Sequence, residues 1–121
     1  MIELVEVKTA ELVDLALDWC VAKADNLAVK LVRGGRYGEP ESLWFVASML
    51  GGWKYSPSTD WSQGGPLIEK HVTALNQTGT HTWWAHCEDR LGMGNTALIA
   101  ACRAIVASVL GDTVSVPKEL V

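Results

Sequence analysis

Two segments, one near each end of the chain, carry apolar residues at the spacing of an α-helix. In residues 10–24, apolar side chains recur every three or four positions, and acidic residues lie largely elsewhere. Thr9 stands at the N-cap position, so we expect this helix to begin directly after it. The apolar face that should meet the sheet consists of Leu12, Leu15, Ala16 and Trp19.

The second helix is predicted for residues 97–110. Asn95 or Thr96 can cap its start, and Gly111 can end it, because glycine takes a left-handed closing conformation at little cost. Alanines occupy much of the remaining surface, which allows neighbouring elements to approach closely. The predicted apolar stripe consists of Leu98, Cys102, Ile105 and Val109.

Shorter apolar segments between and before these helices predict β-strands. Residues 2–7 alternate weakly, and residues 27–32 alternate as in a strand with at least one buried face. The apolar run 43–50 favours a strand over a helical turn. Together with the helices, these strands indicate an α+β fold in which a small, mostly antiparallel sheet packs against two helices. The length of 121 residues favours a single domain over residues 1–121.

Residues 71–87 predict a β-hairpin that turns at Thr78-Gly79, with β-branched and aromatic residues on both arms. In that register Trp83 faces Ala74, and Trp84 points to the opposite side of the sheet. The core face would consist of Val72, Ala74, Trp83 and Ala85.

The same register sets His71 opposite His86, which suggests a shared zinc ion. Cys87 and His81 point to the other face, so no third ligand is evident, and we favour histidines without a metal. Trp84 either forms a surface for a partner or is covered by a loop.

Composition narrows the classes of partner. The net charge is −4, and no basic run is present that would neutralise a row of phosphates, so duplex nucleic acid is not the expected partner. A nucleotide-sized anion needs only one or two local cations and stays open. The three cysteines, Cys20, Cys87 and Cys102, are expected to be buried thiols without disulfides.

Membrane and secretory signals are not evident. The longest mostly apolar stretch, residues 97–110, is shorter than the roughly 20 residues that a helix needs to cross a bilayer. Acidic residues interrupt the first apolar positions, which differs from a secretory signal. We therefore expect the protein to stay in the cytoplasm.

The segment Tyr55–Glu69, YSPSTDWSQGGPLIE, has no helical or strand period and is expected to be a polar loop. Its short polar side chains can hold a fixed shape, its paired glycines allow a ligand to come close, and Trp61 offers a flat face for stacking. Arg103 can reach the loop as an anion clamp, or it occupies a solvated helix position. The candidate ligand-binding residues are Ser58, Thr59, Asp60, Trp61, Gln63, Gly64, Gly65 and Arg103.

A structural role for the same segment stays open beside the functional one. Ser-Pro-Ser-Thr-Asp is also typical of a helix cap or an Asx-turn, in which Asp60 satisfies backbone donors and Trp61 fills the core. No Walker loop, nucleophile elbow or Ser/Cys–His–acid pattern is evident. We therefore expect a protein that is not an enzyme and that uses no cofactor.

Three segments carry a resemblance to a known family: VKTAELVDLALDWCVAKA, YSPSTDWSQGGPLIEKH and TALIAACRAIVASVLGDTVSVPKEL. Together they resemble the NinX-type small proteins of lambdoid phages and prophages, in the family's order and over most of the chain. The sequence departs from that pattern at residues 33–54 and 93–96. The resemblance implies a phage or prophage origin, an accessory role and the cytoplasm of the infected bacterium, but no reaction.

We expect a non-enzymatic binder of a nucleotide-like small molecule, for example one that sequesters a signal of bacterial defence. A base would stack on Trp61, while Ser58, Thr59, Asp60 and Arg103 would contact sugar and phosphate. A homo-oligomer is expected if the pocket lies between chains. The alternative is an interaction module that modulates a host protein through Trp83 or Trp84 and a sheet edge.

Overall fold

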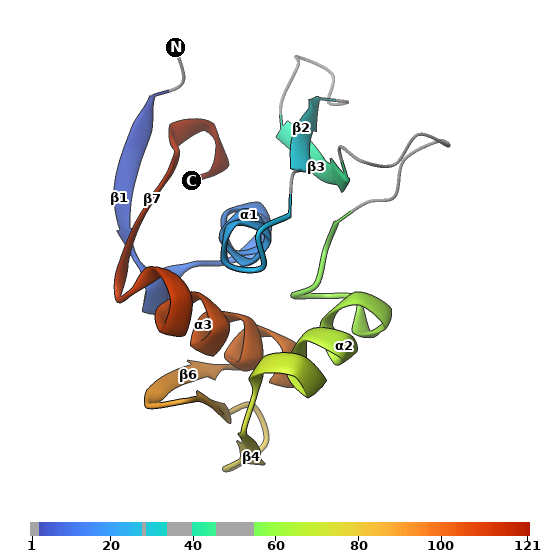
Figure 1. Ribbon diagram of the computed structural model, residues 1–121, viewed down its shortest axis with the longest axis vertical. Helices are drawn as coiled ribbons and strands as arrows, with labels where there is room; N and C mark the ends of the chain where they lie inside the picture. Colours follow the sequence, from blue (N-terminus) through green and yellow to red (C-terminus); the bar gives the residue numbers. More distant parts are fainter. Residues whose placement is uncertain (1–2, 28, 34–39, 46–54) are drawn as a thin grey trace.

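The structure is a computed structural model that describes residues 3–27, 29–33, 40–45 and 55–121. Its centre is helix α3 (Ala97–Leu110), with the other elements arranged around it (Figure 1). The prediction of this helix is confirmed at both ends. Thr96 Oγ1 accepts a hydrogen bond from the Ile99 N–H at 3.1 Å, and Gly111 follows with φ of 96°.

Elements pack on several sides of α3, so its buried surface is wider than one stripe. Small side chains such as Ala100 and Ala104 are fully buried, which allows backbone elements to lie against the helix. Val109 belongs to the predicted stripe but is 51% exposed, because it lies in the last turn, beyond the elements that cover the helix. The inclusion of Val109 in the core was therefore wrong.

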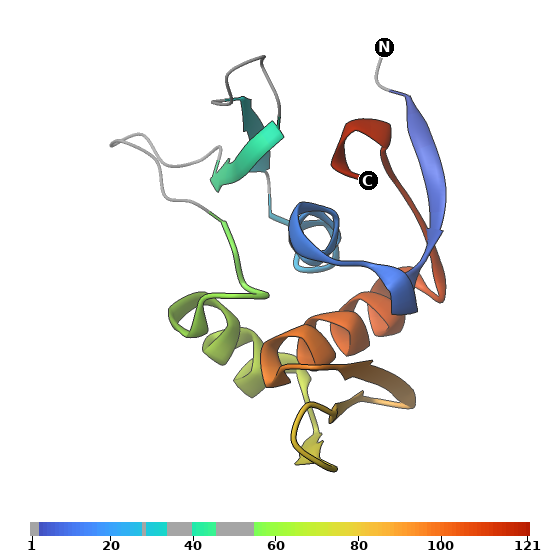
Figure 2. The same ribbon diagram turned by 180° about the vertical axis from the view of Figure 1, so that it is seen from behind.

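One layer against α3 is an antiparallel sheet of β4 (Ala74–Gln77), β5 (Trp83–Cys87) and β6 (Arg90–Gly94), in that order. Figures 1 and 2 show this sheet on the side of α3 that faces away from α1. Gly92 makes the close contact possible, because a Cβ there would collide with the backbone of Ala100 and Ala104.

The predicted hairpin exists, but its register differs. Gln77 pairs with Trp83 and Ala74 pairs with His86, and the Thr78 N–H donates to the Thr82 carbonyl at 2.9 Å across a longer loop. Sequence reasoning assumed a two-residue turn at Thr78-Gly79, and the extra loop residues shift every pair.

The new register changes the core face. Leu75, Trp83 and Ala85 face the core, whereas Ala74, which we placed there, is exposed. Val72 lies just before β4 and packs against the core from there. His71 does not face His86, so the two-histidine hypothesis is wrong.

A second layer is formed by β1 (Leu4–Lys8), which pairs with β7 (Thr113–Pro117), and by α1 (Asp14–Ala24). The prediction that Thr9 caps α1 was wrong. Thr9 begins a short 3-10 turn, η1 (Thr9–Glu11), and its hydroxyl donates to the Gly111 carbonyl at 2.6 Å. The hydroxyl therefore links the segment after β1 to the C-terminal end of α3, and it does not cap α1.

The buried face of α1 also differs from the predicted one. Ala16 is buried as expected, and so is Leu12, which lies just before the observed helix, but Leu15 and Trp19 are only half-buried. Because α1 packs on another helix and on β7, its contact surface is broader than the stripe expected for packing on a sheet. Additional fully buried apolar residues of α1 are Leu17, Cys20 and Val21.

A third pair of strands, β2 (Val29–Arg33) and β3 (Pro40–Phe45), is antiparallel. The expected strand at residues 43–50 is observed as far as Phe45, and its remainder lies outside the described residues. A short 3-10 turn, η2 (Lys118–Leu120), follows β7. The described residues thus form an α+β fold of helices and small antiparallel sheets, as predicted.

The main difference from the sequence prediction is α2 (Trp61–His71), which forms where we expected a polar loop. Asp60 caps it, accepting a hydrogen bond at Oδ1 from the Ser62 N–H at 2.9 Å. Gly64 and Pro66 argue locally against a helix, but Gly64 lets it lie tightly against Leu98 of α3 and the Pro57 carbonyl. Packing therefore overrides local propensity in this segment.

Candidate functional site

All the residues predicted to bind a ligand except Arg103 lie around the start of α2, and several of them make hydrogen bonds that stabilise the fold. Ser58 is 3% exposed, and its N–H donates to Asp18 Oδ1 at 2.9 Å. Gln63 Oε1 accepts a hydrogen bond from the Ser56 N–H at 2.8 Å. Together with the capping carboxylate of Asp60, these contacts fit the structural alternative for the segment.

The remaining members of that set lie nearer the surface. Trp61 is 58% exposed, so the expectation that it fills the core was wrong. Thr59 is exposed, and its hydroxyl donates weakly to the Ser56 carbonyl at 3.4 Å. Gly65 has open space where a Cβ would stand.

Asp18 is a buried carboxyl group beneath this segment. Burial raises its pKa to about 6 from the ordinary 3.8, although hydrogen bonds from Ser58 favour the charged form. The group joins α1 to the segment that precedes α2. Its raised pKa makes it a source of pH-dependent stability.

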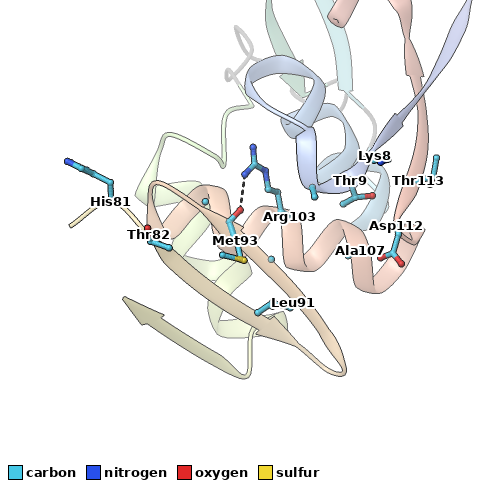
Figure 3. Close-up of a pocket in the computed structure, with 13 residues that line it drawn as sticks. Lys8, Thr9, His81, Thr82, Leu91, Met93, Arg103, Ala107, Asp112 and Thr113 are labelled. Carbon is cyan, nitrogen blue, oxygen red and sulfur yellow. Dashed lines mark hydrogen bonds between the residues drawn. The ribbon is translucent and has the colours of Figure 1, made fainter. Parts of the chain in front are cut away.

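Arg103 does not join this set. Its Nε donates to the Leu12 carbonyl at 3.0 Å and its Nη1 to the Met93 carbonyl at 2.8 Å. Figure 3 shows the side chain extending from α3 toward Met93 at the mouth of a cleft. The prediction that Arg103 reaches the Tyr55–Glu69 segment was therefore wrong, because the side chain instead contacts Leu12, between η1 and α1, and Met93 of β6.

This cleft has a volume of about 600 Å³ and lies between two sheets, with α3 at its base. One wall comes from β6 and the loop between β4 and β5, and the other from the end of β1, η1 and the start of β7 (Figure 3). Residues 58–65 do not line it. The lining consists of Lys8, Thr9, Ala10, His81, Thr82, Leu91, Gly92, Met93, Gly94, Arg103, Ala107, Asp112 and Thr113.

The fixed position of Arg103 gives the cleft a pre-organised donor group. A guanidinium carries five N–H donors, and the two hydrogen bonds to backbone carbonyls use two of them. Burial lowers the pKa of the Arg103 guanidinium, but an arginine keeps its charge near neutral pH. A positive group with donors to spare therefore stands at the cleft.

The other charged groups of the cleft leave it positive. Lys8 adds a second cation from β1. Asp112 is the acidic residue of the lining, and Arg90 Nη1 lies 3.0 Å from its carboxylate. The cleft is thus cationic in a protein whose net charge is −4.

The backbone of β6 supplies the other polar groups of the cleft. In the described part of the chain, β6 is the last strand of its sheet, and the Met93 carbonyl turns away from β5 to accept from Arg103. Leu91 and Met93 are 42% and 45% exposed, so the strand also presents apolar surface beside the cleft.

Sequence reasoning found one member of this cleft, Arg103, and missed the rest. Lys8 and Asp112 lie more than a hundred residues apart and meet only because β1 pairs with β7. One local signal was available: Gly92 and Gly94 alternate in an otherwise apolar segment, which indicates close approach of backbone.

Fold and cleft define a small α+β protein with a cationic cleft between two antiparallel sheets. A family model described as Bacteriophage P22, NinX matches residues 8–109, and the chain belongs to that family. A search of curated proteins finds no match. In the described residues no helix is long and apolar enough to cross a membrane, and no group of three metal-ligating side chains is found.

Proposed function

We propose that this phage protein is a non-enzymatic binder of a small, nucleotide-like anion, and that the ligand occupies the cleft between β6 and the β1–β7 sheet. The observation that carries the proposal is Arg103, which two backbone carbonyls hold at the cleft with donors left over. A guanidinium fixed in advance loses little freedom when it binds an anion.

The size and lining of the cleft favour a small molecule over an inorganic ion. A volume of about 600 Å³ falls within the usual range of roughly 300–1,000 Å³ for small-molecule pockets. Leu91, Met93 and Ala107 offer apolar contact for a ring, while Arg103 and Lys8 attract negative charge. This division matches a ligand with one flat apolar part and one anionic part.

Binding without turnover fits an accessory role in the infected cell. A protein that holds a nucleotide-like signal of bacterial defence lowers its free concentration in proportion to the number of protein copies. No reaction is needed for that effect, and we propose none.

Isothermal titration calorimetry with a panel of mononucleotides and dinucleotides tests the proposal. The variant Lys8→Met removes one cation from the cleft, and Lys118→Met removes an equal charge from an exposed side chain just after β7. We expect Lys8→Met to weaken nucleotide binding about tenfold and Lys118→Met to leave it nearly unchanged. Absence of heat from every nucleotide, or equal losses in both variants, would refute the proposal.

A second candidate is a protein–protein interaction module, favoured by the half-exposed Leu91 and Met93 beside the open edge of β6. Native mass spectrometry of protein purified from bacterial cells separates the two. A retained mass of a few hundred daltons per chain favours the small ligand, and a retained protein partner favours the module. The same spectra report the oligomeric state, for which we propose a homo-oligomer.

A further inference from the structure

The pattern of hydrogen bonds in the three-stranded sheet shows which backbone groups of β6 face the cleft. The His86 carbonyl accepts from the Thr73 N–H at 2.8 Å, so the polar groups of His86 point away from β6. Its partner across the β5–β6 ladder is Leu91. Antiparallel pairs alternate between hydrogen-bonded and non-bonded, so Leu91 and Met93 both stand at non-bonded positions.

The N–H and C=O groups of Leu91 and Met93 therefore point outward, along the open edge. Arg103 confirms this orientation independently, because its Nη1 reaches the Met93 carbonyl from outside the sheet. With that carbonyl occupied, the next two groups along the edge are the Leu91 carbonyl and the Met93 N–H. They form an adjacent acceptor and donor at the wall of the cleft.

We propose that the ligand is a nucleotide with an amino-bearing base, adenine in the first place, whose edge pairs with these two groups. The exocyclic amino group of adenine donates to the Leu91 carbonyl, and the neighbouring ring nitrogen accepts from the Met93 N–H. Adenine carries such a donor next to an acceptor. This inference rests on the proposed function and specifies the base, which is the part of the ligand that Lys8 and Arg103 do not recognise.

The surroundings of the edge favour a ring over an added peptide strand. A peptide that extended the sheet would need the Met93 carbonyl as well, and Arg103 already occupies it. A base needs only the two free groups and gains apolar contact from Leu91, Met93 and Ala107. Its anionic part can then meet Lys8 on the facing wall and the remaining donors of Arg103.

The test compares three ligands by calorimetry on the unmodified protein. Adenosine 5′-monophosphate carries both the base edge and the phosphate, purine riboside 5′-monophosphate lacks only the amino group, and ribose 5-phosphate lacks the base. We expect the first to bind at least tenfold more tightly than the second, because the Leu91 carbonyl would lose its partner. The third should bind more weakly still.

The outcomes separate this inference from the proposed function. If all three ligands fail to bind, the proposed function fails and this inference fails with it. If all three bind equally well, the cleft holds an anion as proposed, but the pairing with β6 is refuted. An affinity of purine riboside 5′-monophosphate equal to that of adenosine 5′-monophosphate also refutes the pairing.

A backbone variant gives a second test. Met93→Pro deletes the N–H that faces the cleft and removes no bond to β5, and proline is tolerated on edge strands. Met93→Leu keeps that N–H and serves as the control. We expect Met93→Pro to lower the affinity for adenosine 5′-monophosphate about tenfold and Met93→Leu to change it little. Unchanged affinity in a folded Met93→Pro protein overturns the pairing, and if that variant does not fold, the ligand comparison still decides.

Discussion

Replacing Asp18 with asparagine should stabilise the protein at alkaline pH. Asp18 is 3% exposed and accepts a hydrogen bond from the Ser58 N–H, a bond that Asp18→Asn can keep through its Oδ1. Burial disfavours the charged carboxylate and raises its pKa to about 6, so folding favours the protonated form. The asparagine has the same shape and carries no charge at any pH.

The size of the effect follows from linkage. A pKa of about 6 in the folded protein and an ordinary value of 3.8 differ by roughly 2 units, or about 3 kcal/mol. This stability is fully present below pH 3.8 and is lost as the pH rises through about 6. At pH 8 we therefore expect Asp18→Asn to exceed the wild-type protein in unfolding free energy by up to about 3 kcal/mol, or roughly 10 °C in Tm. Near pH 4 the two should be nearly equal.

Urea titrations and thermal melts at pH 4, 6 and 8 measure this difference. Glu69→Gln is the control, because it removes a carboxylate from the exposed surface of α2. Its effect should be small at every pH. The reasoning is refuted if Asp18→Asn is no more stable than the wild-type protein at pH 8, or if its advantage does not grow between pH 4 and pH 8.

Three further predictions concern packing, capping and a second pH-dependent contact. Gly92→Ala should cost about 2 kcal/mol or more in urea titrations, because its Cβ meets the backbone of α3, whereas Gly65→Ala, with open space at its Cβ, should not destabilise. Thr96→Ala removes the cap of α3 and should cost about 1 kcal/mol in the same assay, and an unchanged midpoint would contradict that role. Burial raises the pKa of the Asp25 carboxyl, but hydrogen bonds from Lys70 and His71 outweigh burial and lower that pKa below its ordinary value. The stability that Asp25 contributes is therefore present above about pH 4 and is lost in acid. Asp25→Asn should cost about 1 kcal/mol at pH 7 and nothing at pH 2, and a loss of equal size at both would rule out the ionic contact.

Local sequence patterns predicted an element correctly where that element carries its own capping and termination signals. Residues 97–110 combine a capping threonine, an apolar composition and a closing glycine, and the observed helix has the predicted bounds. The buried, unbridged state of Cys20, Cys87 and Cys102 also followed from their number and spacing. The α+β class followed from the order of such segments, because the period of the apolar residues reports the element type directly.

Tertiary contacts decided the segments whose local signals conflict. Residues 61–71 contain two glycines and a proline, yet they form a helix because Gly64 fits closely against Leu98. The hairpin loop was misread for a similar reason. Its register is set by which face of β5 packs on α3, and the two-residue turn signal at Thr78-Gly79 does not contain that information.

The candidate site belongs almost wholly to the tertiary structure. Sequence alone singled out Arg103 as a cation in an apolar helix, and the fold supplied its partners, the carbonyls of Leu12 and Met93. Lys8 reaches the same cleft only because β1 pairs with β7 from the far end of the chain. Element type depends on neighbours within a few residues, so sequence can determine it. A cleft depends on surfaces that meet across the whole chain, so only the folded structure determines which side chains line it.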